Sequence, residues 1–441
     1  MAVQARDAEA SPATPPPGAL SRSRIPLILL TAVLAVDQAD RYLLSSVFPL
    51  LRDDFGLSDG QLGSLSAAFL LVATVGSLPF GILVDRTVRT RVAAWGAALW
   101  SVAMLATGLA TSYSTLFLSR MGLGVAESSY TPASFSLLTD YYPVEERSRV
   151  LGIYQVGSVI GFLGLPIGGF IATHWGWRAA FDLYALAGFV VALLVWRLHE
   201  PPRGVADGMR TPTVAEEPRS PFAVMSAFAA FRYVLRIPSV TVSLVTNALA
   251  VFFTSGLGIW ATTFLVRYHH LSLTKATAAT SLLGVGAIVG MLWGGRLGDR
   301  LVAAGRPAGR VEVAAAAQIV GVLLLFPAFA VHGMLPMLIL FAFGAVTLTM
   351  PNAPLSALRA DVVHPDLRGR AAAVQSVLYA VAAAASPLVI GLLSDSIGLR
   401  GALLVILPLM GVGGIAMVLF GRRAVEPDRL RMQASLLEPT P

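Results

Sequence analysis

Long apolar segments follow one another along nearly the whole chain, and they limit the fold more than any other feature. Twelve segments approach the roughly 20 residues that a helix needs to cross the hydrocarbon core of a bilayer. They lie at 25–51, 60–84, 91–111, 115–139, 148–173, 178–198, 239–266, 275–298, 310–331, 334–360, 368–394 and 400–420. Only 13% of the residues are charged, about half the share of a soluble domain. The sequence therefore predicts an all-α membrane protein with twelve transmembrane helices.

A polar stretch rich in proline, arginine and glutamate divides these segments into two groups of six. The predicted organisation is a disordered tail at 1–24, an N-terminal bundle at 25–198, a linker at 199–238, a C-terminal bundle at 239–420 and a tail at 421–441. The first apolar segment is too long for the core of a signal peptide and is crossed by charged residues. We therefore expect it to be retained as the first transmembrane helix.

Two short elements occur at matching positions of both halves. The first comprises Gly81, Asp85 and Arg86 in one copy and Gly295, Asp299 and Arg300 in the other. The second comprises Asp140, Pro143 and Arg147 in one copy and Asp361, Pro365 and Arg368 in the other. Such an internal repeat is typical of transporters built from two pseudo-symmetric bundles, with the substrate site between them near the membrane midplane.

The distribution of basic residues predicts the orientation in the membrane. With both termini in the cytoplasm, most of the 32 lysines and arginines fall in cytoplasmic loops and tails, as the positive-inside tendency requires. The outer loops hold Arg52, Arg178, Arg267, Lys275 and Arg400. Because the basic residues are scattered among short loops, the net charge of +7 does not indicate a nucleic-acid partner. The strong preference for arginine over lysine suggests a GC-rich bacterial genome, and hence a bacterial inner membrane.

Charged residues inside two N-terminal segments are the strongest functional signal. Asp37, Asp40 and Arg41 share one face of the first predicted helix, and Arg120 and Glu127 share one face of the fourth. Ionisable groups at this depth are costly and are usually paired or functional. Burial favours a protonated carboxyl, whereas a neighbouring arginine favours the ionised form. We therefore expect a proton-coupling site formed by these five residues, with Asp40 as its main protonatable group; a static ion-pair network is the alternative.

The C-terminal half contrasts with this charged half, because its segments carry almost no charge away from their ends. One charged bundle and one apolar bundle suit an amphipathic anion, with its head group on the arginines and its tail on the apolar helices. The predicted substrate-binding residues are Arg41, Arg120, Tyr130, Tyr154, Gln155, Asn247, Phe253, Trp260, Phe264 and Tyr379. The alternative for any single aromatic residue is that it packs between helices or faces lipid.

The repeated glycine, acid and arginine elements lie at the cytoplasmic ends of the second and eighth segments. We expect charge-assisted hydrogen bonds from these elements to helix ends of the opposite bundle, which would hold the outward-open state closed on the cytoplasmic side. The predicted gating residues are Gly81, Asp85, Arg86, Arg89, Asp299 and Arg300. For the arginines, plain anchoring of the topology is an equal alternative.

The motifs resemble those of a known family over nearly the full chain. The element at Gly81–Arg91, with Val88 where a glycine is usual, is similar to the loop 2–3 signature of the major facilitator superfamily. Three further motifs resemble the Spinster branch of that superfamily. They are Asp37, Asp40, Arg41 and Tyr42; then Asp59, Gln61 and Gly63; and then Arg120, Gly122 and Glu127. The resemblance implies a proton-linked carrier of lysolipids or sphingoid phosphates that is driven by the proton gradient and needs no bound cofactor or metal.

Other functions remain open at this point. A proton–drug antiporter, a carrier of small organic anions or sugar phosphates, and a channel share the predicted architecture. A membrane-embedded transferase is a remote alternative, because the linker offers no nucleophile–base pair and no metal-ligand spacing. We expect a monomer that is not an enzyme, with the bilayer and an amphipathic small molecule as its partners.

Overall fold

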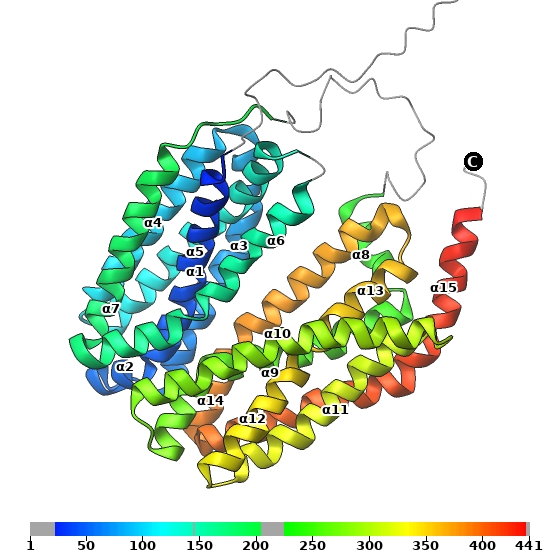
Figure 1. The fold of residues 1–441 in the computed structure, drawn as a ribbon. Helices are drawn as coiled ribbons and strands as arrows, with labels where there is room; N and C mark the ends of the chain where they lie inside the picture. The colour runs from blue at the N-terminus through cyan, green and yellow to red at the C-terminus, as the bar shows by residue number, and fades with distance from the viewer. Residues whose placement is uncertain (1–22, 144–145, 204–224, 438–441) are drawn as a thin grey trace, which may run out of the picture.

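The computed structural model describes residues 23–143, 146–203 and 225–437, and this part of the chain folds into helices without strands (Figure 1). The first half forms α1 (Ile25–Ser46), α2 (Phe48–Phe55), α3 (Asp59–Arg86), α4 (Arg89–Gly108), α5 (Tyr113–Tyr141), α6 (Arg147–Gly161) and α7 (Gly164–Trp196). The second half forms α8 (Ala227–Val234), α9 (Pro238–His269), α10 (Leu273–Ala303), α11 (Gly309–Ala330), α12 (Met334–Thr349) and α13 (Asn352–Val362). It ends with a 3₁₀ turn (Pro365–Leu367), α14 (Arg368–Ala416), a π-helical turn (Met417–Gly421) and α15 (Arg422–Leu437).

Two glycines convert long helices into pairs of membrane passes. Gly176 in α7 and Gly398 in α14 have φ values of 84° and 76°, a conformation that side chains with a Cβ rarely adopt. With these breaks, the described residues contain six passes in each half, which confirms the predicted all-helical fold. The passes are α1, α3, α4, α5, α6 with the start of α7, and the rest of α7, followed by α9, α10, α11, α12 with α13, and the two parts of α14.

Hydropathy supports passage through a membrane. Within the described residues, seven helical segments are long and apolar enough to cross a bilayer. Two of them, Arg149–Trp196 and Pro365–Ser435, contain the breaks at Gly176 and Gly398 and are long enough for two passes each. Helices α1, α4 and α5, which complete the twelve passes, are not among the seven.

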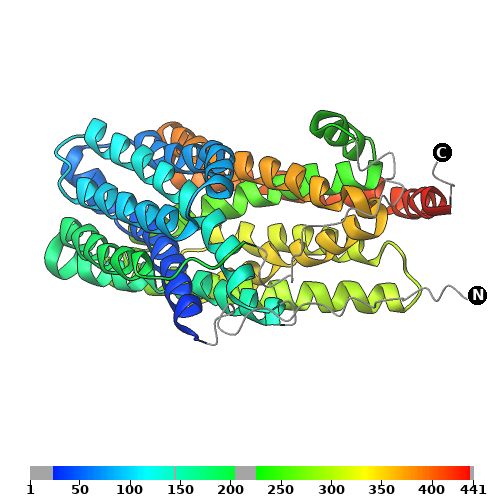
Figure 2. The ribbon, with the colours of Figure 1, turned by 90° about the horizontal axis from the view of Figure 1, so that it is seen from above.

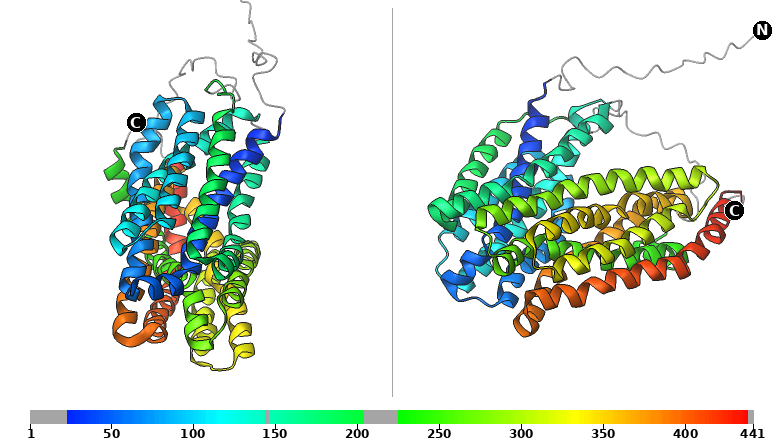
Figure 3. Two further views of the ribbon diagram at one scale, coloured as in Figure 1. Left: turned by 90° about the vertical axis from the view of Figure 1, so that its left-hand side faces the viewer. Right: turned by 60° about the horizontal axis from the view of Figure 1, so that its bottom comes forward.

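The two bundles lie side by side and meet at only one end. We call the end that carries residues 197–203 and α8 the linker end, and the end that carries α2 the far end. Figure 1 shows the bundles diverging toward the linker end, and Figures 2 and 3 show the same two groups from other directions. Toward the far end, α3 packs against α14, and a Cβ added at Gly63 would collide with the backbone at Pro387. Small residues at such crossings allow close approach of helices in lipid.

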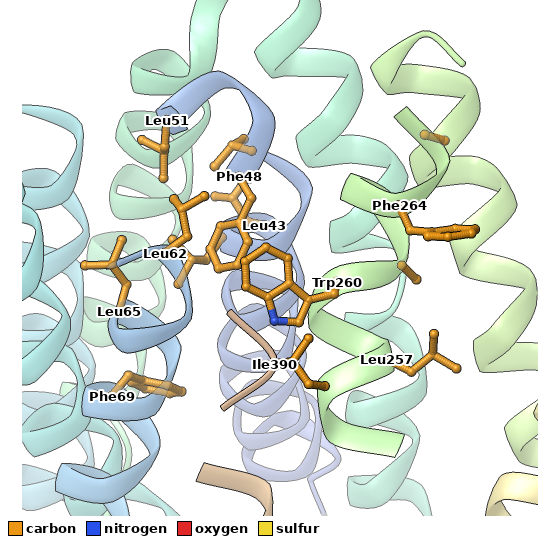
Figure 4. Close-up of a cluster of buried hydrophobic side chains, with 14 of the residues drawn as sticks. Leu43, Phe48, Leu51, Leu62, Leu65, Phe69, Leu257, Trp260, Phe264 and Ile390 are labelled. Carbon is orange, nitrogen blue, oxygen red and sulfur yellow. The ribbon is translucent and has the colours of Figure 1, made fainter. Parts of the chain in front are cut away.

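A tryptophan of the second bundle lies in the core near this junction. The indole of Trp260 on α9 is fully buried, packs edge-on against Phe48 at 5.3 Å between ring centroids, and donates a hydrogen bond of 3.1 Å to the carbonyl of Pro387. Figure 4 shows it between residues of the first bundle, such as Leu43, and Ile390 of α14. Trp260 therefore joins the two bundles on the far-end side of the cavity described next.

Candidate substrate and proton site

A cavity of about 300 Å³ lies between the two bundles, and its two walls differ in chemistry. The N-terminal wall presents Gln38, Asp40, Arg41, Tyr42, Leu44, Ser66, Phe69, Leu70, Arg120 and Phe162. The C-terminal wall presents Thr254, Ser255, Leu257, Gly258, Ile259, Leu283, Gly284, Ala287, Ala345, Leu348 and Thr349. All charged groups of the cavity thus come from α1 and α5, and the opposite wall is apolar apart from three hydroxyls.

Arg120 is the deeper of the two arginines in this cavity. Its residue is only 1% exposed, and its guanidinium lies 3.4 Å from both carboxylate oxygens of Asp40. It also donates a hydrogen bond of 2.8 Å to the hydroxyl of Thr107 and lies over the ring of Phe181 at 5.0 Å. The pair with Asp40 bridges α1 and α5 in apolar surroundings, where an unpaired charge would be strongly unfavourable.

Arg41 forms the second and more accessible pair. Its guanidinium pairs with Glu127 on α5 and lies 3.8 Å from Asp37, one helical turn away on α1. The Arg41 side chain is 32% exposed and lies over the ring of Phe69. The charged faces of α1 and α5 thus meet as the helical spacing predicts, and a ligand in the cavity can reach Arg41.

The other predicted substrate residues of the first bundle do not line this cavity. Tyr130 lies beside Asp37 at a separate small void within the N-terminal bundle. Tyr154 is buried in an apolar cluster with Leu34 and Leu137, and Gln155 is exposed on α6. None of these three side chains lines the cavity in this conformation, and their role in binding stays a prediction.

The predicted residues of the second bundle also lie outside the cavity wall. Phe253, Trp260 and Phe264 are fully buried in the core; the ring of Phe264 packs on Phe329 and Phe341. The amide of Asn247 donates hydrogen bonds to the hydroxyl of Tyr379 (2.9 Å) and to the side chain of Asn352 (3.2 Å). These aromatic and polar groups stabilise helix packing in this conformation, and their role in binding stays a prediction.

The predicted gating residues of the first bundle, at the end of α3 and the start of α4, make no contact across the bundles in the described part of the chain. Arg89 lies within the first bundle and binds Asp140, Glu200 and the carbonyl of Pro201. Gly81 and the exposed Arg86 lie on α3, whereas the side chain of Asp85 is outside the described residues. Burial raises the pKa of Glu200, but hydrogen bonds from Arg89 and Thr90 outweigh it and hold the pKa below its usual value.

The second copy of the repeated element, with Asp299 and Arg300 on α10, also makes no contact across the bundles in the described part of the chain. Asp299 accepts a hydrogen bond of 2.9 Å from Arg310, which also pairs with Asp361, and Arg300 is exposed. The bundles are apart at this end of the molecule. In a conformation closed at the linker end, these residues would contact the opposite bundle. Those contacts stay a prediction.

A charged network at the far end was not predicted from the sequence. Asp59, at the start of α3, is 3% exposed on its side chain and binds both terminal nitrogens of Arg267 on α9, at 2.6 and 2.5 Å. It also accepts hydrogen bonds from Arg52 (2.7 Å) and from Ser394 on α14. Asp395, next to Ser394, accepts hydrogen bonds of 2.8 Å from the backbone N–H groups of Asp59 and Gly60. This network joins the two bundles across the far end.

Two signals in the sequence could have found this network. Asp59 belongs to one of the motifs that carry the family resemblance, and Arg267 is one of few basic residues in the predicted outer loops.

A second ion pair at the far end stays within the first bundle: Arg178 donates a hydrogen bond of 2.7 Å to Asp54, and Trp177 donates another. Both hydrogen bonds lower the pKa of Asp54.

Comparison with known proteins agrees with this architecture. The family model of the Major Facilitator Superfamily matches residues 30–317 and 308–439. The chain is 26% identical over 399 residues to protein spinster homolog 1 of Xenopus laevis, covering 85% of this chain and 74% of that protein. It is 29% identical over 280 residues to an uncharacterized MFS-type transporter, YceJ, of Bacillus subtilis, covering 62% of this chain and 66% of the relative.

A solved structure shares the fold over nearly the whole chain. It is a bacterial homolog to the human lysosomal transporter Spinster, in an inward-facing and unoccupied conformation, and it superposes with a TM-score of 0.80 at 22% identity. The alignment covers 93% of this chain and 99% of that one. Two helical bundles around a central cavity, together with the family match, show that the chain belongs to the Major Facilitator Superfamily and is a multi-pass membrane transporter, not an enzyme.

Proposed function

We propose that this protein is a proton-coupled secondary transporter that moves an amphipathic organic anion, such as a lysophospholipid or a sphingoid phosphate, by alternating access. The observation that carries the proposal is the two-faced cavity, with Arg41 and Arg120 on one wall and apolar side chains on the other. An anionic head group fits the first wall, because arginine binds phosphate and carboxylate through paired hydrogen bonds. An acyl chain fits the second wall, where its burial is favourable.

The orientation follows from the charge distribution. The positive-inside tendency assigns the linker end to the cytoplasm, with both termini on that side. The conformation would then be inward-facing, with the far end closed by the network around Asp59. The predominance of arginine suggests a bacterial inner membrane as the location.

The charged pairs suggest how proton and substrate are coupled. Asp40 and an anionic substrate compete for Arg120, since each neutralises the same guanidinium. Protonation of Asp40 removes its charge and frees Arg120 for the substrate, and release of the substrate favours loss of the proton. Glu127 and Arg41 form a second pair of the same kind nearer to the cavity opening.

We predict that Asp40→Asn removes the dependence of transport on the proton gradient. Asparagine keeps the shape of the side chain but cannot exchange a proton, so the occupancy of Arg120 no longer follows pH. Uptake of a labelled lysophospholipid into proteoliposomes would be measured with and without a pH gradient. Asp54→Asn, at an acid outside the cavity, is the control that should keep the response; an unchanged response in Asp40→Asn would exclude Asp40 from coupling.

A second prediction concerns the head group. Arg120→Ala should weaken binding of a phosphate-bearing lysolipid by about ten- to a hundredfold, the loss expected for one or two charge-assisted hydrogen bonds. A monoacylglycerol, which lacks the phosphate, should bind the variant and the original protein equally. Equilibrium binding of both lipids to purified protein separates these effects, and equal phospholipid binding by Arg120→Ala would contradict an anion site.

The size of the cavity favours a second candidate, a small organic anion or a sugar phosphate. A volume of about 300 Å³ lies at the lower end of the range for small-molecule sites. A thermal-shift and proteoliposome screen across lysolipids, sphingoid phosphates, sugar phosphates and cationic drugs distinguishes the candidates. Lysolipid responses that need Arg120 support the first candidate, and responses to sugar phosphates alone support the second.

A further inference from the structure

A buried arginine in the second bundle has no acidic partner among the residues that the structure describes. Three arginines are buried among the described residues: Arg89, Arg120 and Arg359. Arg89 pairs with Asp140 and Glu200, and Arg120 pairs with Asp40. Arg359, on α13 and 5% exposed, makes no ion pair within the described part of the chain.

The contacts of Arg359 leave part of its guanidinium free. One terminal nitrogen donates a hydrogen bond of 2.9 Å to the hydroxyl of Ser356, and the guanidinium also interacts with the hydroxyl of Tyr379. The other terminal nitrogen, Nη1, is buried and makes no hydrogen bond to the described residues. The described acids at this end of the second bundle have basic neighbours of their own: Asp299 and Asp361 with Arg310, Glu312 with Arg306 and Arg422, Asp366 with His364, Glu426 with Arg429, and Asp428 with Arg431. Because arginine does not lose its proton in proteins, Arg359 cannot become neutral to avoid the cost of burial.

The internal repeat shows that packing alone does not require an arginine at this position. Asp140 of the first half corresponds to Asp361 of the second half, so Leu138 corresponds to Arg359. Leu138 is fully buried in an apolar cluster. An arginine at the equivalent position therefore has a reason other than filling space between helices.

A cavity provides that reason. About 190 Å³ of space lies against Arg359, and it is lined by Ser356, Arg359 and Ala360 of α13 and by Arg368, Ala371, Ala372 and Gln375 of α14. Ser356 and Arg368 are exposed, so the cavity is open at the linker end of the second bundle, where α13 lies (Figure 1). It contains two guanidinium groups, a hydroxyl and an amide, and none of the described carboxylates lines it. The first turn of α14 adds the positive end of a helix dipole.

We propose that Arg359, Arg368, Ser356 and Gln375 form a phosphate-binding site that is separate from the central cavity. Donors from two helices suit a group with several acceptor oxygens, and the guanidinium fork of Arg359 matches phosphate geometry. The phosphate belongs either to a soluble ion or ester or to the head group of an anionic lipid. The site does not depend on the proposed transport function, because no residue of the central cavity takes part in it.

The test is the thermal stability of the purified full-length protein with and without inorganic phosphate, at matched ionic strength in chloride. Phosphate should raise the melting temperature of the original protein by about 2 °C, as a ligand several times above its dissociation constant does. Arg359→Leu copies the residue of the first half, so it should fold, melt at an equal or higher temperature without phosphate, and show no phosphate shift. Arg368→Gln, at an exposed position, should weaken the apparent affinity by about two- to fivefold.

Two controls and a second ligand make the result decisive. Arg300→Gln, an exposed arginine at the same end, and Arg120→Ala, in the central cavity, should both keep the phosphate shift. Mixed micelles containing phosphatidylglycerol replace phosphate in a parallel series, with monoacylglycerol as the phosphate-free lipid. A shift with phosphatidylglycerol alone that Arg359→Leu abolishes identifies a lipid head group as the ligand. Shifts that are equal in Arg359→Leu and the original protein, or no shift with either ligand, would overturn the proposal.

Discussion

Asp59→Ala should shift the protein from the conformation closed at the far end toward one that is open there. In the structure, the Asp59 carboxylate binds Arg267 and Ser394 of the second bundle and Arg52 of its own. These bonds across the bundles exist only while the far end is closed. Removing one partner of a buried ion pair costs about 3–5 kcal/mol, and partial exposure of Arg267 reduces this to about 2–3 kcal/mol. The ratio of the two conformations should therefore change by about 30- to 150-fold.

Distances between labels on the two bundles would measure this shift. The sequence contains no cysteine, so single cysteines at the exposed positions Ser114, at the start of α5, and Leu335, at the start of α12, give labels without a background. Both positions lie at the far end, and pulsed spin-resonance measurements should show a longer-distance population in Asp59→Ala.

Asp54→Ala is the matched control for this experiment. It also removes an acid bound to an arginine at the far end, but Asp54 and Arg178 both belong to the first bundle. The control should therefore keep the original distance distribution. If Asp59→Ala and Asp54→Ala gave the same distribution, the network around Asp59 would not hold the far end closed.

Arg89→Ala should cause the largest loss of stability among single changes at the linker end. The guanidinium is 1% exposed and binds Asp140, Glu200, Ser136 and the carbonyl of Pro201. It thereby connects the segment that follows α7 with α4 and α5. Loss of the arginine leaves buried acceptors without their donor, which costs about 3–5 kcal/mol.

Thermal unfolding of the purified protein would measure this loss, with Arg91→Ala as the control. Arg91 lies two residues further along α4 and is exposed, so its removal deletes the same charge without breaking buried bonds. The folded-state pKa of Glu200 lies below its ordinary value of 4.5. Its share of the stability is therefore present above about pH 4.5 and is lost as the pH falls through the lower, folded-state pKa. Equal melting temperatures of the two variants would show that the network around Arg89 adds no stability.

The positions of the charged residues along α1 and α5 could be predicted, but their pairing could not. A spacing of three, four or seven residues places Asp37, Asp40 and Arg41 on one face of a helix, and Arg120 and Glu127 on another. Arg41 could in principle pair with Asp37 on its own helix or with an acid on α5. The crossing of α1 and α5 decides that it pairs with Glu127 and that Asp40 pairs with Arg120.

Aromatic side chains of the second bundle were harder to place from the sequence. A helix that is apolar on every side gives no hydropathy signal for which face meets lipid, core or cavity, because lipid tails are as apolar as leucine. The sequence therefore suggested Phe253, Trp260 and Phe264 for the cavity, and the structure buries all three in the core. The wall is formed instead by small and aliphatic residues such as Gly258 and Leu283.

The sequence by itself determined the elements of this protein: twelve apolar segments, their division into two repeated halves, and the confinement of charge within segments largely to the first half. These properties are local, since each transmembrane helix satisfies its own backbone hydrogen bonds and its length follows from the bilayer. Only the tertiary structure decided which end is closed, that Asp59 joins the bundles there, and that Arg359 is buried with none of the described acids beside it. Those facts depend on how distant helices cross, and neither hydropathy nor helical periodicity contains that information.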